Sequence, residues 1–547
     1  MTNIKTNNNN KKEIEIILKE IERTKSWDSD SLQKILREYP KNGKEMYAKD
    51  ELVHVYRLKQ KNGYKSKKVE ERIRMKPTRT NSGVAVVTVL TKPYPCPGNC
   101  IYCPNEENMP KSYIASEPGA QRALSNKFDP YAQVFNRLIA LKNVGHNIEK
   151  VELIILGGTW SYYDKDYQLS FIYDCFRALN DVKENSSDYV EPREGELKRV
   201  SWEEIENVHK ENETAYCRNV GLVLETRPDY ITEEELIRMR RLGATKVQIG
   251  IQSLSNEILK KNNIGRKNEA TKEAFKLLRR MGFKIHGHWM PNLYGSTVKR
   301  DIKDYEKLWT KEYRPDELKI YPTSIIKNTH LNYLYQHGLY EPYTDRELTN
   351  LLKTILPLTP RYCRLTRVVR DIPSGEIVAG NKKTNLRQLV QQEMDKENIK
   401  VEDIRSREIR GKKVTEDMLE MEEIEYDTTV SKEFFISYKT KDEDKICGFL
   451  RLSLPKGRYK NKHFLDELEG CAIIREVHVY GKVLGLGKDS KGESQHLGLG
   501  KSLIKEAEKI SKDYGFKKIS VISAIGTREY YKKRGFEIKN LYMHKKL

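Results

Sequence analysis

The sequence lacks any run of apolar residues close to the roughly 20 that a membrane-spanning helix needs, so we expect no membrane span. Its first residues, MTNIKTNNNNKKEIE, lack the apolar core of a secretory signal, and we therefore expect a cytoplasmic protein. Negative charge is also in deficit, because 79 acidic residues face 100 basic ones and leave a formal net charge of +21. Such an excess attracts polyanions, of which nucleic acid is the commonest in cytoplasm.

Cysteine is sparse, and its distribution argues against a structural zinc site. Three of the eight cysteines, Cys96, Cys100 and Cys103, lie on one short loop with the spacing C-x3-C-x2-C. Structural zinc usually takes four ligands in two separated pairs, and the other five cysteines form no second pair. Core packing is a poorer explanation, because the loop is rich in proline, glycine and asparagine. Three thiolates on one loop can instead hold three irons of a four-iron cluster and leave the fourth iron open.

Strands and helices alternate from residue 84 onward. Apolar runs are expected to form six strands, at residues 84–90, 151–156, 220–224, 246–251, 283–290 and 317–321. Helical stretches lie between them, which indicates parallel βα units. Six units with a ligand-bearing loop after the first strand predict an α/β fold: a partial (βα)6 TIM-like barrel, open on one side, with chemistry at the carboxyl ends of its strands.

The cysteine spacing, on a loop after the first strand of a βα series, resembles the radical S-adenosylmethionine (SAM) enzymes. In that family three cysteines hold a [4Fe-4S] cluster whose free iron binds the methionine part of SAM, so the resemblance implies that Cys96, Cys100 and Cys103 are cluster ligands. It implies further SAM-binding residues at the later strand ends: Gly157, Gly158, Thr159, Glu225 and Gln252. A plain left-handed turn would explain the glycines equally well, and a satisfied buried network would explain any single polar residue.

The C-terminal part predicts a second, α+β domain. Residues 433–439 and 446–454 are expected to be strands, residues 471–481 follow, and Gln495-His-Leu-Gly498-Leu-Gly500-Lys501 opens a helix that runs to about residue 514. Glycines at a helix start expose backbone N–H groups, which together with the helix dipole make a seat for pyrophosphate. A strand at residues 518–523 comes next, and then Tyr530 and Tyr531 before an Arg-Gly-Phe turn.

This succession resembles the GNAT acetyltransferases, which bind acetyl-CoA. The resemblance implies that amides of residues 498–501 hold the pyrophosphate, that residues 476–479 face the pantetheine arm, and that Tyr531 lies near the thioester sulfur. Core packing of the last helix is the alternative for this tyrosine. The implied acetyl-CoA residues in this part of the chain are Glu476, Val477, His478, Val479, Gln495, Gly498, Leu499, Gly500, Lys501 and Tyr531.

A radical SAM barrel joined to an acetyltransferase module resembles the catalytic-subunit family of Elongator, which modifies the wobble uridine of tRNA. The resemblance also runs through residues 145–152, 367–373, 405–408 and 476–481. In that family the lysine matching Lys150 is associated with acetyl-CoA, so Lys150 and Tyr531 are the implied catalytic residues. By itself, Lys150 is only a lysine that enters a strand. Some relatives bind zinc through linker cysteines, but residues 398–409 contain none, so zinc is doubtful here.

The resemblance implies a reaction that places a carboxymethyl group on carbon 5 of the uridine. Acid–base side chains are poor tools for that carbon–carbon bond, so a cofactor must carry the hard chemistry. The reduced cluster would cleave SAM to a deoxyadenosyl radical, which would take hydrogen from the acetyl methyl of acetyl-CoA, and the carbon radical would add to the base. Thioester cleavage would then release coenzyme A and leave the carboxymethyl group on tRNA. A carbon radical does not survive diffusion through water. We therefore expect one shared cavity, with the acetyltransferase domain packed over the open barrel mouth.

The first 80 residues hold 21 lysines and arginines against 12 acids and are expected to form a small helical region. Cations contact phosphates, and flat side chains such as Tyr56 and Tyr64 offer stacking surfaces to bases. A solvated lysine-rich surface is the alternative. The expected tRNA-binding residues are Arg57, Lys65, Lys67, Lys68, Arg72, Arg74, Lys76 and Arg79.

Four segments are therefore expected: a tRNA-binding region at 1–80, the barrel at 81–360, a basic linker at 361–425 and the acetyltransferase domain at 426–547. The linker arginines either clamp the anticodon arm or form an ion-paired interface with neighbouring acids. They are Arg361, Arg364, Arg367, Arg370, Arg405, Arg407 and Arg410. We expect the chain to act as a stand-alone monomer or a homodimer.

Two other functions stay open. A protein-lysine acetyltransferase with a structural barrel would need a carboxylate base, for which Glu476 is the candidate, and it would leave the three clustered cysteines without a task. The second is a tRNA-binding assembly subunit that has lost catalysis.

Overall fold

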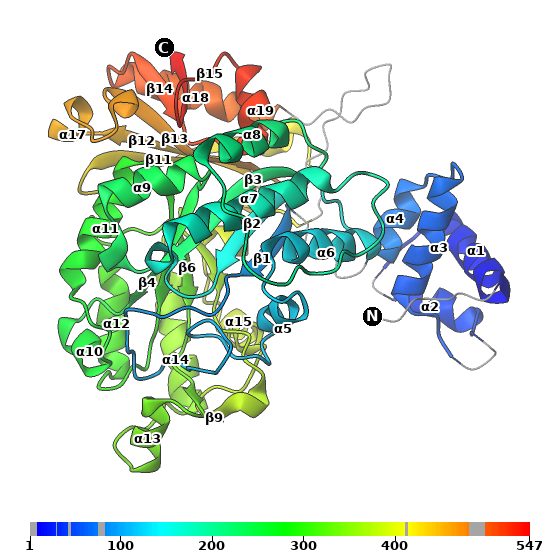
Figure 1. The fold of residues 1–547 in the computed structure, drawn as a ribbon, viewed down its shortest axis with the longest axis horizontal. Coiled ribbons are helices and arrows are strands. Elements are labelled where there is room, and N and C mark those ends of the chain that lie inside the picture. The colour runs from blue at the N-terminus through cyan, green and yellow to red at the C-terminus, as the bar shows by residue number, and fades with distance from the viewer. Residues whose placement is uncertain (1–7, 29, 42–44, 75–81, 411–413, 481–497) are drawn as a thin grey trace.

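The computed structural model describes residues 8–28, 30–41, 45–74, 82–410, 414–480 and 498–547. In these residues two seven-stranded sheets each form the centre of a domain, and a group of helices stands to one side of them (Figure 1). No helix in the described ranges combines the length and the apolar character that a membrane span requires.

The first sheet is an open parallel barrel. Its strand order follows the chain, from β1 to β6 and then β8, and every pairing is parallel. The strands are β1 (Ala85–Leu90), β2 (Lys150–Leu156), β3 (Arg218–Thr226), β4 (Lys246–Gln252), β5 (Lys284–Trp289), β6 (Glu317–Ile320) and β8 (Arg364–Arg367). The six expected strands are confirmed. The seventh, β8, lies in the stretch that we interpreted as a linker, because its four residues carry too little apolar pattern to indicate a strand.

Helices cover the outer face of this barrel (Figure 1). They are α6 (Pro130–Asn143), α7 (Lys165–Asp181), α8 (Trp202–Asn212), α9 (Glu233–Arg241), α11 (Asn268–Arg280), α12 (Val298–Lys307) and α14 (Asp345–Ile355). Successive strand side chains point to opposite faces, so alternate residues pack under the helices, as Leu153 and Val247 do. The residues between them line the interior, for example Glu152, Gln248 and His286.

The second sheet carries the acetyltransferase fold. Strands β10 to β13 are antiparallel neighbours, and β14 pairs parallel with β13. The elements are β10 (Leu419–Asp427), β11 (Ser431–Thr440), β12 (Ile446–Pro455), β13 (Cys471–Val479), α18 (Leu499–Asp513), β14 (Lys518–Val521), α19 (Arg528–Lys532), β15 (Glu537–Ile538) and β16 (Met543–Lys546). Apolar residues of α18, including Leu503 and Ala507, pack on this sheet. Strand β10 begins at Leu419, inside the predicted linker.

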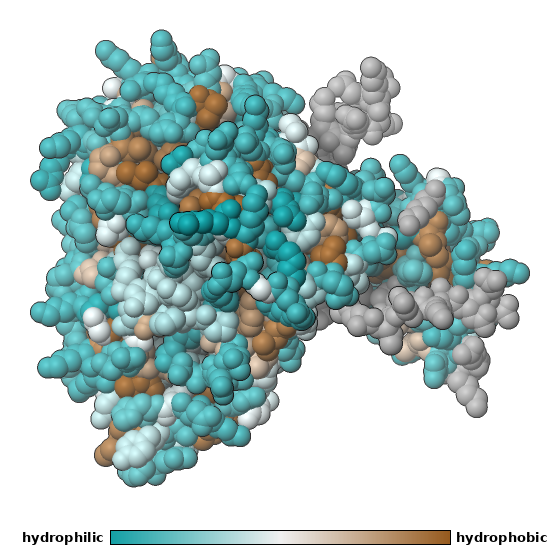
Figure 2. All heavy atoms as spheres, viewed as in Figure 1, coloured by the Kyte–Doolittle hydropathy of each residue, from teal (hydrophilic) through white to brown (hydrophobic). Residues whose placement is uncertain are grey.

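The N-terminal region is helical, as expected, and has an apolar core of its own that includes Ile17, Leu52 and Tyr56. Its helices are α1 (Asn8–Arg23), α2 (Ser31–Glu38), α3 (Lys49–Lys61) and α4 (Lys67–Ile73). The guanidinium of Arg74 donates to the carbonyl of Gly145, just after α6, at 2.9 Å. Hydrophilic side chains dominate this face of the molecule (Figure 2).

The acetyltransferase domain packs against the amino ends of the barrel strands, away from the cysteine loop (Figure 1). A side chain on Gly526 would lie 2.9 Å from the nitrogen of Asn219, at the start of β3. Tyr542 donates to the carbonyl of Met281, just before β5, at 2.6 Å. Our expectation that this domain covers the barrel mouth is therefore wrong.

A buried ion cluster explains the packing at this end. Asp316, which precedes β6, pairs with Arg475 at 2.7 Å, with Arg279 at 3.2 Å and with Arg451 at 3.5 Å. Arg475 also pairs with Glu433 at 2.8 Å, and each of these side chains is at most 2% exposed. Burial by itself would raise the pKa of Asp316, but the three guanidinium groups hold that pKa far below its usual range. Asp316, at the amino end of the barrel, is thus paired with Arg475 and Arg451 of the acetyltransferase domain.

Candidate active site

One cavity of about 1420 Å³ joins the two domains through the barrel interior. Tyr102 and Gln252 line it near the cysteine loop, and Glu476 and Tyr531 line it in the acetyltransferase domain. The expectation of a single shared cavity is therefore confirmed, although the two ends lie at opposite ends of the barrel.

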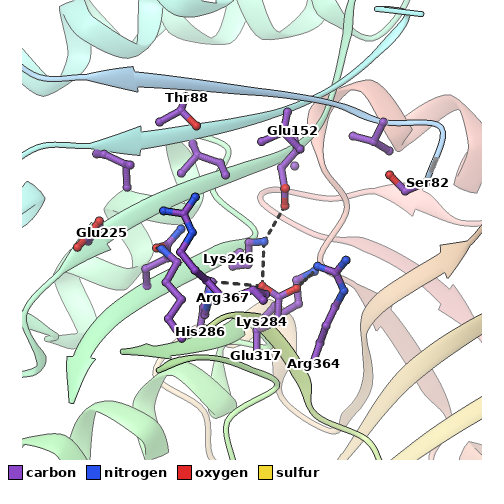
Figure 3. A pocket seen from close by; sticks show the side chains of 18 of the residues that line it. Ser82, Thr88, Glu152, Glu225, Lys246, Lys284, His286, Glu317, Arg364 and Arg367 are labelled. Atoms are coloured by element: carbon purple, nitrogen blue, oxygen red, sulfur yellow. Dashed lines mark hydrogen bonds and ion pairs between the residues drawn. The ribbon is translucent and has the colours of Figure 1, made fainter. Parts of the chain in front are cut away.

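Paired charges occupy the middle of this cavity (Figure 3). Lys246 contacts Glu152 at 2.7 Å and Glu317 at 3.1 Å, and Lys284 contacts Glu317 at 3.4 Å. Burial opposes ionisation of Glu317, but the two lysines lower its pKa well below the usual value. These carboxylates therefore stay ionised inside the barrel.

Glu476 belongs to the same chain of ion pairs and lies at the boundary between the domains. One of its oxygens accepts from Lys284, and the other accepts from Arg451 at 2.8 Å. The two cations outweigh burial and lower the pKa of Glu476. A general base needs a free lone pair and a pKa near the working pH. Each oxygen of Glu476 keeps a free lone pair, but the lowered pKa moves this carboxylate away from the working pH and makes it a poor base for the lysine-acetyltransferase alternative.

Tyr531 lies at the acetyltransferase end, on α19. Its side chain is 6% exposed and packs edge-on against Tyr530 and Phe536, with ring centroids 5.2 and 5.7 Å away. Burial raises its pKa, so the phenol stays protonated and can donate a hydrogen bond. Lys150, the first residue of β2, is exposed and lines the same cavity. The two implied catalytic residues therefore share one cavity.

Strand β13 contributes Glu476, Val477, His478 and Val479 to the cavity wall. A register shift between Arg451 and Leu452 opposite this segment makes a bulge, which re-aims local side chains. His478 packs on Phe449, and its Nε2 has no hydrogen-bond partner among the described residues. Burial lowers the pKa of this imidazole, which keeps it neutral.

The start of α18 lies beside the cavity rather than in its wall. Gly498 has φ +69° and precedes the first turn, a backbone conformation that favours glycine. A side chain on Gly500 would fall on the hydroxyl of Tyr530, which does line the cavity. Leu499 is buried and Lys501 is exposed. Gln495 lies outside the described residues.

The three cysteines follow β1 and are half-buried. Cys96 Sγ lies 3.7 Å from Thr159 Oγ1. The same sulfur accepts a hydrogen bond from the backbone nitrogen of Gly98 at 3.5 Å. Burial raises the pKa of Cys100, and it raises that of Cys103 to about 12, so the free thiols are protonated. Over the described ranges no three histidine, cysteine or acidic side chains are gathered as a metal site. Metal binding is what deprotonates such thiols and draws them together, and three thiols on one loop suit an iron–sulfur cluster.

The SAM candidates lie along the neighbouring strand ends. Gly157 has φ +140°, and a side chain there would fall on Thr91, so packing alone accounts for this glycine. Gly158 donates to the hydroxyl of Tyr163 at 3.4 Å. Thr159 is brought beside Cys96, as described above, which connects the second strand end with the cysteine loop.

Glu225 and Gln252 line the cavity from β3 and β4. Burial raises the pKa of Glu225, and His288 Nδ1 lies 3.6 Å from its Oε1. Gln252 has φ +61°, which is unusual for a residue other than glycine, and its buried Oε1 has no partner within the described chain. Such a strained, unsatisfied group at a cavity wall is typical of a ligand site.

Comparison with known proteins agrees with this architecture. Residues 94–304 match the Radical SAM superfamily, residues 315–396 match the Radical_SAM C-terminal domain and residues 399–536 match the acetyltransferase (GNAT) family. The tRNA uridine(34) acetyltransferase of Methanocaldococcus infernus is 37% identical over 94% of this chain and 98% of its own length. Elongator complex protein 3 of Saccharomyces cerevisiae is 36% identical over 87% of this chain and 85% of its own length.

The chain belongs to this family of tRNA uridine(34) acetyltransferases and Elongator complex protein 3. A solved structure of the Methanocaldococcus infernus Elp3 with an N-terminal deletion has the same fold, with a TM-score of 0.69 and 35% identity. The match covers 85% of this chain and 99% of that one.

Four charged residues that line the main cavity were not predicted from the sequence. They are Glu152, Lys246, Lys284 and Glu317. Each lies within or at the start of an otherwise apolar strand. Polar residues that alternate with apolar ones on adjacent parallel strands would have been a usable signal, because buried charges need partners on neighbouring strands.

The N-terminal basic residues divide into exposed and structural ones. Lys65 and Lys67 are exposed, whereas Arg72 donates to the carbonyl of Thr24 and stacks over Trp27. Arg74 binds Gly145 as described, Lys68 donates to the carbonyl of Glu22, and Arg57 is half-buried. Lys76 and Arg79 lie outside the described residues. RNA binding by this region stays a prediction.

The stacking role expected for Tyr56 is wrong, because its ring is 2% exposed and its hydroxyl donates to the carbonyl of Ser66. The helical spacing of this tyrosine placed it in the apolar core of the region. Tyr64 is half-buried and bonds to Glu22.

Most linker arginines are ion-paired, as the interface alternative predicts. The pairs are Arg361–Glu422 at 2.8 Å, Arg364–Glu408 at 2.7 Å, Arg367–Asp371 at 2.9 Å, Arg370–Glu117 at 2.7 Å and Arg407–Glu422 at 3.0 Å. Arg405 and Arg410 differ, because in the described part of the chain each donates only to a backbone carbonyl.

Proposed function

We propose that this chain modifies the wobble uridine of tRNA, placing a carboxymethyl group on carbon 5 with acetyl-CoA as the source of the two carbons. The observation that carries the proposal is the single cavity that joins the cysteine loop to the acetyltransferase fold. The relatives with the same two domains, named tRNA uridine(34) acetyltransferase, support it. The tRNA anticodon arm is the proposed partner, while a cytoplasmic location and action as a monomer or homodimer stay predictions.

The cysteine end is proposed to bind a [4Fe-4S] cluster through Cys96, Cys100 and Cys103. SAM would lie against Gly157, Gly158, Thr159, Glu225 and Gln252. When bound, these groups supply the one-electron chemistry that acid–base side chains lack. The unsatisfied Gln252 Oε1 offers a hydrogen-bond acceptor, and Thr159, beside Cys96, can orient a ligand next to the cysteine loop.

The acetyltransferase end is proposed to bind acetyl-CoA. Amides at the start of α18 face the pyrophosphate, and β13 residues such as Val477 and Val479 contact the pantetheine arm. Tyr531 stays protonated in its buried position and can donate to the thioester group, while Lys150 contributes a cation on the same wall. The ionised pairs in the middle of the cavity keep the passage polar between the two ends.

A direct test uses methyl-labelled acetyl-CoA, tRNA and SAM with cluster-reconstituted protein and reductant under anaerobic conditions. We expect label on uridine at the wobble position. Cys103→Ala should lose both the iron–sulfur absorbance and the label, whereas Cys175→Ala, a buried cysteine on α7, should keep both. Label on protein lysine would favour the acetyltransferase alternative, and absence of label from loaded protein would reject the proposal.

A further inference from the structure

A second cavity, of about 710 Å³, lies beside the main one. It is lined by α15 (Leu386–Lys396), by the end of α16 (Ile404–Arg407) and the residues after it, and by Glu443 and Lys445 before β12. Residues Arg405, Glu408, Ile409 and Arg410 line both cavities. One short segment is thus a shared wall of the two cavities.

Three arginine side chains gather on this wall, and among the described residues only one of them, Arg387, has an ion pair with a carboxylate. Arg405 donates to the carbonyl of Thr366 at 2.5 Å, and Arg410 donates to the carbonyl of Arg405 at 3.3 Å. Arg387, on α15, binds the carbonyl of Leu365 at 2.7 Å and has only a 3.8 Å contact with Asp403. Within the described residues no closer acid pairs with these three guanidinium groups.

The nearby acids are already engaged. Asp403 accepts hydrogen bonds from the backbone of Leu365 and Arg405. Glu408 is taken by Arg364 at 2.7 Å, and Asp395 accepts from Gln391 at 2.9 Å. Glu443 has a partner of its own. Burial, together with repulsion by Arg387 and Arg364, lowers the pKa of Arg405 to about 10, so an arriving anion would relieve unfavourable electrostatics.

We propose that this second cavity binds a backbone phosphate of the RNA whose base enters the main cavity. Guanidinium groups form paired hydrogen bonds with phosphate oxygens, which suits Arg405 and Arg410. The amides of Gln388, Gln391 and Gln392 line the same cavity and can contact the sugar without reading sequence. This inference rests on the proposed function, and it assigns the bound phosphate to a nucleotide adjacent to uridine 34.

The test measures binding of an anticodon stem–loop RNA to the full-length chain. Methylphosphonates replace, one at a time, the phosphates on either side of uridine 34, which removes a single charge. For the wild-type chain we expect one of these replacements to weaken binding about tenfold, whereas a methylphosphonate in the stem leaves the affinity unchanged. This comparison needs no protein variant.

The double variant R405Q/R410Q supplies the protein side of the test. Glutamine keeps a polar side chain but removes both charges, so we expect affinity for the unmodified RNA to fall and the sensitivity to the methylphosphonate to disappear. The slope of log affinity against log salt should become shallower by about one to two. Lys396→Gln, an exposed change at the end of the same helix, is the matched control and should behave like wild type.

The outcomes separate this inference from the proposed function. Normal RNA binding by the wild type that is insensitive to both methylphosphonates and to R405Q/R410Q overturns the phosphate site alone. No RNA binding by the wild type overturns both. Because the phosphate of acetyl-CoA has the same chemistry, acetyl-CoA affinity is measured in parallel. A loss of that affinity in R405Q/R410Q, with RNA binding intact, would assign the cavity to the coenzyme and overturn the RNA assignment.

Discussion

At the scale of single residues, burial and neighbouring charge together decide which cavity side chains are ionised. His286 and His288 are buried beside Lys319, and both effects lower their pKa values well below the ordinary one, so the imidazoles are neutral. Glu317 is equally buried but lies between Lys246 and Lys284, and it stays charged. Hydrogen-bond donors and acceptors on this wall are therefore set before any ligand enters.

His209 makes the effect of burial measurable. It lies on α8 against Phe176, and burial, with repulsion from Arg528 and Arg240, lowers its pKa to about 3. Because the folded pKa is below the unfolded value of about 6.5, its contribution to stability is full above that pH and is lost as the pH falls toward the folded pKa. His209→Met should therefore reduce the pH slope of the unfolding free energy between about pH 6 and about pH 4 by up to about 1.4 kcal/mol per pH unit. Urea denaturation across this range tests it, and an unchanged slope would refute the buried neutral imidazole.

At the scale of elements, the start of α18 packs closely against the side chain of Tyr530 on α19. Gly498 supplies the left-handed turn, and Gly500 leaves room for the Tyr530 hydroxyl that separates the helix from the cavity. The amides of this first turn are the expected pyrophosphate seat, so their direction depends on that close approach. In the proposed binding mode, this element would couple coenzyme binding to one aromatic side chain of α19.

Gly500→Ala should weaken acetyl-CoA binding by up to about tenfold, or about 1.4 kcal/mol, because the added methyl meets the Tyr530 hydroxyl, so that either this side chain or the helix start must shift. Isothermal titration with acetyl-CoA measures this. Tyr530→Phe removes the hydroxyl, so G500A/Y530F should regain most of the affinity, and Y530F alone should bind like wild type. Unaltered binding by G500A, or no recovery in the double variant, would show that this contact does not position the helix.

At the scale of the whole molecule, charge pairing holds the two domains in one arrangement. The pairs run without interruption from Glu152 through Lys246, Glu317, Lys284 and Glu476 to Arg451, and on to Asp316. Buried pairs of this kind contribute little net stability when complete, but they make other arrangements costly because each would leave a buried charge alone. The ion pairs therefore favour this one placement of the two domains.

Asp316→Asn should destabilise the protein by about 3–5 kcal/mol, since Arg475, Arg279 and Arg451 would lose their common buried carboxylate. Chemical denaturation followed by circular dichroism measures the change. Asp371→Asn, which removes the exposed partner of Arg367, is the control and should leave stability nearly unchanged. Equal effects of the two substitutions would show that the buried cluster does not hold the interface.

Local pattern was enough to predict much of this fold and part of the site. The six strands, the cysteine loop and the helix after Gly498 each depend on residues close together in the chain, such as alternating apolar side chains or a glycine turn. The ion-paired state of Glu476 escaped prediction, because its partners Lys284 and Arg451 lie on other elements. The core position of Tyr56 escaped although its spacing from Leu52 on α3 is a local signal, because the cations around it favoured an exposed interpretation.

The sequence by itself determined which strand residues face the barrel interior, because the two-residue period of a strand follows from backbone geometry. Only the tertiary structure decided that the acetyltransferase domain lies at the amino ends of those strands. That choice depends on Asp316 meeting Arg475, 159 positions away, in a place that excludes water. A charge shows in the sequence that it needs a partner when buried, but not which distant side chain will supply it.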